Sequence, residues 1–254
     1  MPFCVIKSRT IKIVLAMAVV VVLLTISFYG GSAAEVFFGY SSRLVPIYNV
    51  DTQEKVVALS YDAAWGADKT EDILAVLAEY DVKATFFLVG MWVDKYGDKV
   101  KAINEAGMEI GTHTDTHPDL AKNAESVIKS ELETSMNKIT AITRNPVTLF
   151  RAPFGSYNNT VINVASSLGL KTIQWNIDSL DWKGLSSVDV NTRVMNALVP
   201  GSIILMHNNA DYVVQSTRLV LENLKTRGYK VVPIGELIYQ DNYTIDHAGK
   251  QIKN

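Results

Sequence analysis

The chain of 254 residues has little cysteine and no surplus of either charge. Its only cysteine is Cys4, and its 24 lysines and arginines are balanced by 26 aspartates and glutamates. This balance excludes the broad basic surface that nucleic-acid binding requires, so we expect no nucleic-acid partner. Low-complexity segments and internal repeats are also absent. With 48% hydrophobic residues, the chain can bury a full core, and we expect a globular protein.

Long hydrophobic runs are absent except near the N-terminus, where residues 13–26 are almost entirely apolar. A short basic tip precedes this run; its residues are Lys7, Arg9 and Lys12. The layout is typical of a cleaved signal peptide, with Ser32 and Ala34 at plausible cleavage positions. It is also typical of a membrane anchor over residues 11–29, which nearly reach the required length of about 20. We therefore expect a single-pass membrane protein, or one secreted after cleavage.

The basic tip keeps the N-terminus cytoplasmic, so residues after about Ser32 are expected outside the cytoplasm. Cys4 then lies on the cytoplasmic side, and the exported part has neither a disulfide nor a thiol nucleophile. We divide the chain into the tip and signal or anchor helix (1–34), a connector (35–51) and one domain (52–254). Cysteine catalysis is excluded for that domain.

Strand and helix patterns alternate through the domain. Seven strands are predicted, at 55–62, 83–90, 108–114, 148–155, 170–178, 201–208 and 229–238. Six helices are predicted between them, at 68–81, 91–106, 124–143, 159–168, 187–198 and 213–227. This alternation predicts an α/β fold with a parallel sheet, either an open doubly wound sheet or a closed barrel. In both, functional groups gather at the carboxyl ends of the strands.

Ionisable side chains stand at five of those seven strand ends, and three of the four histidines are among them. They are Asp62, His113 with His117 just beyond it, Arg151, Asp178 with Asp181 after it, and His207. Random placement would rarely produce this distribution. We expect the site to be built from these groups.

Each of these side chains has a possible chemical role that depends on a neighbouring residue. His113 and His117, four residues apart, can share one divalent cation, and imidazole favours zinc over calcium or magnesium. Arg151 can hold the carboxylate of Asp62 and keep it ionised. His207 can act as a general acid if an aspartate, either Asp178 or Asp181, raises its pKa. The amide of Phe154, beside flexible Gly155, can point at a developing oxyanion.

The ordered motifs resemble those of a known family. The segments are SYDAAW (60–65), HTDTH (113–117), RAPFG (151–155), DSLDW (178–182) and LMH (205–207). Together they resemble the five motifs of the NodB-type polysaccharide deacetylases, carbohydrate esterase family 4. The form YDAAWG and the short chain with its anchor are most similar to the sporulation-associated, PdaB-like branch.

The resemblance implies a distorted (β/α) barrel that removes acetyl groups from N-acetylated sugars. It implies the following roles: Asp62 is the general base, His113 and His117 are metal ligands, Arg151 holds the base, Phe154 supplies the oxyanion amide, Asp181 partners the general acid His207, and Trp182 and Leu205 line the acetyl-methyl pocket. A divalent metal, zinc by preference, is the implied cofactor. The implied substrate is peptidoglycan or a related glycan, and we expect a monomer.

One departure from the family pattern is Ala63, which stands where the family usually has a second aspartate that binds the metal. Asp68 or Asp115 is an alternative source of that oxygen. A site with two histidines and water would bind metal more weakly than one with three protein ligands. Two hypotheses remain. One is a metal-dependent deacetylase of peptidoglycan amino sugars, acting in sporulation or cell-wall maturation. The other is a weak or inactive wall-binding homologue.

Overall fold

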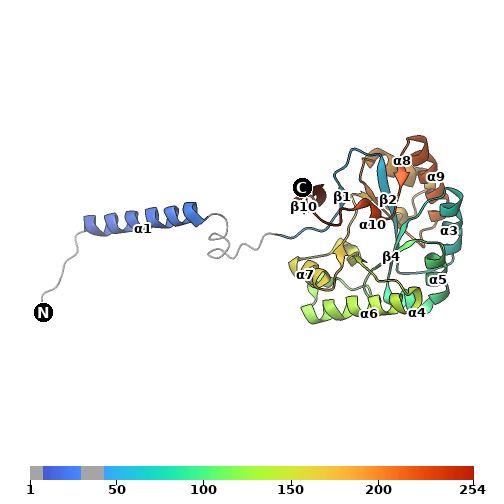
Figure 1. The fold of residues 1–254 in the computed structure, drawn as a ribbon, viewed down its shortest axis with the longest axis horizontal. Helices are drawn as coiled ribbons and strands as arrows, with labels where there is room; N and C mark the ends of the chain where they lie inside the picture. The colour runs from blue at the N-terminus through green and yellow to red at the C-terminus, as the bar shows by residue number, and fades with distance from the viewer. Residues whose placement is uncertain (1–7, 30–42) are drawn as a thin grey trace. The chain divides into compact units, whose positions relative to one another are not determined.

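The computed structural model describes residues 8–29 and 43–254, which fall into two compact units, Met1–Arg43 and Leu44–Asn254 (Figure 1). In the first unit, α1 (Ser8–Tyr29) is a helix of 22 residues. Within the described ranges, no helix combines the length and the apolar character needed to cross a membrane. The cleavage positions Ser32 and Ala34, and Cys4, lie outside the described residues.

The second unit is built on a parallel sheet of eight strands. They are β2 (Val56–Ala63), β3 (Thr85–Leu88), β4 (Glu109–Thr112), β5 (Leu149–Phe150), β6 (Lys171–Thr172), β7 (Ile177–Asp178), β8 (Ile203–His207) and β9 (Lys230–Val231). Seven of them form the order β6-β5-β4-β3-β2-β8-β7, and β9 pairs with β2. Every pairing in this sheet is parallel. This confirms the predicted α/β fold.

The sheet is curled into a distorted barrel. β6 and β7 follow each other in the chain, yet they lie at opposite edges of the seven-strand order. Across a flat sheet those edges would be about 29 Å apart at the usual strand spacing. The chain from Thr172 to Ile177 spans at most about 18 Å. The edges must therefore approach each other, which decides for the barrel over the open sheet.

The gap between the two edges is filled by the segment just before β2. Ile47 bridges to Ile173 beside β6, and Asn49 bridges to Ser202 beside β8. The compact unit accordingly begins at Leu44, so the second half of the predicted connector belongs to it. This part, residues 44–51, is held by two isolated bridges and the two-residue strand β1 (Asn49–Val50), which are too short to show a periodic pattern. A small second sheet contains β1, β11 (Lys250–Lys253) and β10 (Tyr243–Ile245).

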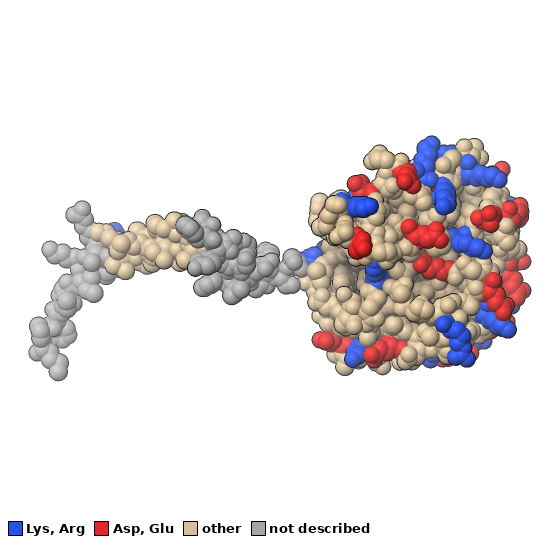
Figure 2. Space-filling view, viewed as in Figure 1, with Lys and Arg blue, Asp and Glu red and all other residues tan. Residues whose placement is uncertain are grey.

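Helices cover the outside of the barrel (Figure 1). They are α3 (Thr70–Glu79), α4 (Gly90–Lys95), α5 (Gly97–Glu105), α6 (Glu125–Thr143), α7 (Asn159–Ser167), α8 (Ser187–Ala197), α9 (Val213–Thr226) and the short α10 (Ile234–Leu237). The predicted helix 91–106 is two helices, because the backbone of Tyr96 leaves the helical region (φ −129°, ψ 45°). The predicted strand 170–178 is likewise two strands, β6 and β7. On the face shown in Figure 2, side chains of both charges are interspersed.

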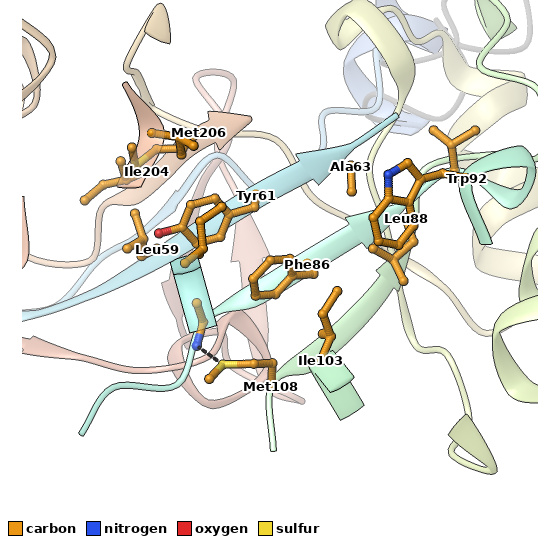
Figure 3. Packing of buried hydrophobic residues seen from close by; sticks show 14 of the residues in the cluster. Leu59, Tyr61, Ala63, Phe86, Leu88, Trp92, Ile103, Met108, Ile204 and Met206 are labelled. Carbon is orange, nitrogen blue, oxygen red and sulfur yellow. Dashed lines mark hydrogen bonds between the residues drawn. The ribbon is translucent and has the colours of Figure 1, made fainter. Parts of the chain in front are cut away.

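Alternation along β2 sorts its side chains into two environments. Leu59, Tyr61 and Ala63 belong to the large apolar cluster that also contains Leu88 and Trp92 (Figure 3). Because successive side chains point to opposite faces of a strand, the residues between them, among them Asp62, face the barrel interior. Neighbouring positions 62 and 63 are therefore presented to different surroundings.

Candidate active site

Asp62 is a buried carboxylate with a buried cationic partner. Its Oδ1 accepts a hydrogen bond of 2.8 Å from Nη1 of Arg151, and the two side chains are 6% and 0% exposed. The guanidinium also donates to the carbonyl of Gln174 at 3.1 Å and lies 4.1 Å from the ring centre of Phe87. Burial is the largest effect on Asp62 and would raise its pKa. The charge and hydrogen bond of Arg151, together with the nearby His113 and His207, outweigh burial and hold that pKa below its usual range. Asp62 is thus a carboxylate at neutral pH.

His207 stands beside Asp62 because β2 and β8 pair in register, with Asp62 opposite His207. Nδ1 of His207 lies 2.8 Å from Oδ1 of Asp181, and its backbone N–H donates to Oδ2 of the same carboxylate at 2.9 Å. A carboxylate accepts, so Nδ1 carries the proton and Nε2 is left to face other partners. Burial is the largest effect on His207 and lowers its pKa. The hydrogen bond and charge of Asp181, with the charges of Asp62 and Asp178, together outweigh burial and raise the pKa above the ordinary value. A raised pKa suits a proton donor.

Asp181 rather than Asp178 is therefore the partner of His207. The carboxylate of Asp178 instead accepts from the backbone N–H of Leu180 at 2.9 Å, within its own turn. The residue pattern alone left either aspartate open, because Asp178 ends the strand and Asp181 follows it closely; the family resemblance implied Asp181. Only the direction of the turn after β7 separates them.

His113 and His117 lie together, with ring centres 4.9 Å apart. Nδ1 of His113 is 2.7 Å from the carbonyl oxygen of Arg151, which can only accept, so Nδ1 donates and Nε2 is free to accept. That Nε2 lies 3.5 Å from Oδ2 of Asp62. Burial lowers the pKa of His113, and burial together with the neighbouring His113 lowers the pKa of His117 to about 4. Both imidazoles are neutral at pH 7, the form that binds metals.

The loop between these histidines is held by Glu131 of α6, which sequence reasoning missed. Its carboxylate accepts three hydrogen bonds of 2.7 to 2.9 Å, from the backbone N–H of Asp115 and from the backbone and hydroxyl of Thr116. The loop needs support because Thr114 and His117 have positive φ angles of 71° and 62°, which are costly for residues other than glycine. In sequence, Glu131 is one acid among many on a solvated helix face. Nothing there marked it.

The donor set does not fit a zinc centre with three protein ligands. Ala63 has no donor, and Asp115 is paired with Lys138 at 2.6 Å. Asp68 is an exposed residue. Within residues 8–29 and 43–254, no group of three histidine, cysteine or acidic side chains is placed to hold a metal ion. Neither predicted substitute for the missing ligand fills the position.

The remaining predicted residues lie around this centre. Phe154 has a positive φ of 60°, and its ring contacts His117 at 4.7 Å between ring centres. Gly155 also has a positive φ, 65°, and a Cβ there would meet Trp175 at 3.4 Å. Leu205 is buried two residues before His207 on the same strand face, whereas Trp182 is 58% exposed. Their roles toward substrate, including the Phe154 amide, stay predictions.

The chain is similar to known polysaccharide deacetylases in sequence and fold. Residues 49–173 match the polysaccharide deacetylase family model. A peptidoglycan-N-acetylglucosamine deacetylase of Bacillus cereus is 30% identical over 75% of this chain and 92% of its own length. The crystal structure of a mutant CE4 family pseudoenzyme with restored enzymatic activity is 37% identical, with a TM-score of 0.74 over 76% of this chain and 71% of its own. The wild-type pseudoenzyme, from Bacillus anthracis, is 36% identical.

This chain therefore belongs to the polysaccharide deacetylase family, as its motifs predicted. Relatives of that family carry the names of peptidoglycan and chitooligosaccharide deacetylases, which are carbon–nitrogen hydrolases. The chain spans 60% of the uncharacterized protein YlxY of Bacillus subtilis and 42% of the Listeria monocytogenes deacetylase PgdA, each 32% identical to it.

Proposed function

We propose that this protein removes N-acetyl groups from peptidoglycan amino sugars. The observation that carries the proposal is the pairing, on adjacent strands, of an ionised Asp62 held by Arg151 with a His207 held by Asp181. A hydrolase of this kind needs a base and an acid on either side of one bond, each with its pKa set for the task. The names of the relatives support the substrate class.

In the proposed reaction, Asp62 takes a proton from the water that attacks the acetyl carbonyl, and Arg151 keeps the carboxylate ionised until that moment. The Phe154 amide is the proposed donor to the oxyanion. When the carbon–nitrogen bond breaks, Nε2–H of His207 gives its proton to the leaving amine, and acetate remains. These proton transfers need only Asp62 and His207. A zinc ion held by His113 and His117 alone would bind more weakly than one with three protein ligands.

A catalytically weak or inactive wall-binding homologue is the second candidate function. Two observations favour it: the alanine at position 63, and the likeness to a pseudoenzyme of Bacillus anthracis. The complete set of acid, base and partner residues favours the enzyme, because loss of function removes the constraint on all of them and not on one ligand alone. Such a homologue would keep the groove for the glycan and lose only turnover.

The proposed location is outside the cytoplasm, at the cell membrane or secreted, in sporulation or cell-wall maturation and as a monomer. The basic tip followed by the apolar residues 13–26 supports export. The similarity of the first motif to the PdaB-like branch supports the sporulation role. Fractionation of cells producing the full-length protein, with protease added outside, tests the location.

One assay separates the two functions. The full-length protein is incubated with acetylated peptidoglycan fragments, with and without added zinc, and released acetate is measured against the Asp62→Asn variant. Release above that variant supports the deacetylase. Binding to peptidoglycan without release supports the wall-binding homologue, and absence of both contradicts both functions.

A further inference from the structure

Trp65 presents an exposed aromatic ring directly beside the candidate active site. Its side chain is 61% exposed, and its ring lies edge-on to His117 with ring centres 4.9 Å apart. The family resemblance gives this position no role. A single exposed apolar side chain is ordinary, but a contiguous group of them beside a site marks a surface that binds something.

The turn that carries Trp65 is fixed from two sides. The carbonyl oxygen of Gly66 accepts from Nε1 of Trp92 at 2.6 Å and from the side-chain amide of Asn208 at 2.8 Å. Gly66 has a positive φ of 59°, and a Cβ there would lie 3.3 Å from the side chain of Asn209. The turn therefore fixes the backbone that carries the indole, and the edge contact with His117 restricts the ring itself. A ring that is already ordered loses little conformational entropy when a ligand covers it.

A second exposed ring lies against the same histidine. Phe154 is 71% exposed, and its ring centre is 4.7 Å from that of His117. Its positive φ of 60° is a conformation that non-glycine residues rarely adopt. We call Trp65, His117 and Phe154 the aromatic platform. It is continuous with the site, because His117 belongs to both.

We infer that the aromatic platform binds the glycan strand, and that a sugar ring next to the deacetylated unit stacks on Trp65. This inference rests on the proposed function for the nature of the ligand. A pyranose ring presents a flat face of C–H groups that can cover an indole, and its hydroxyls stay in water at the rim. None of the platform's contacts requires a metal ion, so this binding is separable from turnover.

The test is a fluorescence titration of the full-length protein with an N-acetylated chitin tetrasaccharide, in the presence of a chelator. Trp65→Ala is expected to raise Kd about tenfold, the change that burial of one aromatic face is expected to give. Trp65→Phe should recover most of the affinity. The matched control is Val199→Ala, an exposed apolar residue before β8, at the opposite end of the barrel, and its Kd should equal that of the wild type. Thermal unfolding establishes that each variant is folded.

Equal affinities for wild type and Trp65→Ala overturn the inference, as does a wild type that does not bind the tetrasaccharide. Sedimentation with anionic lipid vesicles is a second arm. If Trp65→Ala weakens vesicle binding and leaves sugar affinity unchanged, the platform contacts lipid and the inference falls. Failure of the proposed function looks different: no acetate is released, while Trp65→Ala still weakens sugar binding.

Discussion

The candidate site has two halves that differ in completeness: an acid–base half around Asp62 and His207, and a proposed metal half around His113 and His117. In the acid–base half, Asp62 and His207 each have a buried partner, Arg151 and Asp181, at 2.8 Å. In the proposed metal half, His113 and His117 lie together, but the position where the resemblance implies a third ligand is an alanine. One half is complete and the other is not.

The difference lies in what each group does for the fold. Asp62 and Arg151 are both buried charges, and removal of either leaves the other uncompensated in the interior. Ala63 lies in an apolar cluster, where a buried carboxylate would destabilise the fold unless a bound metal ion compensated its charge. Stability therefore maintains the Asp62–Arg151 pair whether or not the protein turns over substrate, whereas the side chain of His207 is 25% exposed and has no such constraint. An alanine at position 63, in place of an acid, does not lower the stability of the fold.

The largest expected effect is that of Asp62→Asn. An amide cannot take the proton of water, so kcat/KM should fall by about 10²–10⁴-fold in the acetate-release assay. The same change leaves Arg151 buried without a counter-charge, so unfolding by urea should show a loss of stability. Asp98→Asn, an exposed acid on α5, is the control for both measurements. Near-normal turnover by Asp62→Asn would remove Asp62 from the mechanism.

Ala63→Asp asks whether the metal half can be completed. If the new carboxylate reaches the two histidines, zinc affinity should rise by about tenfold or more in calorimetric titration of the full-length protein. Without zinc the buried carboxylate should lower the melting temperature, and zinc should restore it. Ala63→Asn is the uncharged control. A destabilised variant whose zinc affinity is unchanged would mean that position 63 points only into the apolar cluster.

Glu131→Ala tests whether the metal half is pre-formed by its loop. Loss of the three hydrogen bonds should let the strained loop relax, and zinc affinity should fall by about tenfold. Glu131→Gln should fall less, because its oxygen still accepts and its amide can donate to the hydroxyl of Thr116. Glu133→Ala, an exposed neighbour on α6, should bind zinc as the wild type does. Faster hydrogen exchange at residues 115 and 116 in Glu131→Ala would locate the effect; unchanged exchange and affinity would contradict it.

The smallest expected effect is a displaced limb of the pH profile. His207 donates a proton, so activity is lost as pH rises through its pKa, which Asp181 raises. Asp181→Asn should therefore move the alkaline limb of kcat/KM to lower pH. The acid limb, set by Asp62 below the usual range of a carboxyl pKa, should stay in place. The profile is measured with and without excess zinc, because metal-bound water titrates in the same region. An unmoved alkaline limb would separate Asp181 from the acid.

The predicted strands and helices agree best with the structure where a pattern of neighbouring residues determines the element. The β-rich run of residues 55–62 and the helix predicted at 213–227 correspond to β2 and α9 within a residue or two. The single predicted strand 170–178 is wrong, because its alternation of apolar and polar residues continues through 173–176, where the backbone crosses between two sheet edges. The C-terminal hairpin of β10 and β11 was missed, because short strands on a polar edge carry little pattern.

The sequence by itself determined the family, the alternating fold and the chemical groups of the site, because each depends on residue type and order along the chain. The sequence alone also shows that position 63 is an alanine and not an acid. The strand and helix pattern alone left the barrel and the partner of His207 open, and the family resemblance implied the barrel and Asp181. The tertiary structure shows both, and it alone reveals that Glu131 holds the histidine loop. Those outcomes depend on which distant segments meet in space, and no local pattern carries that information.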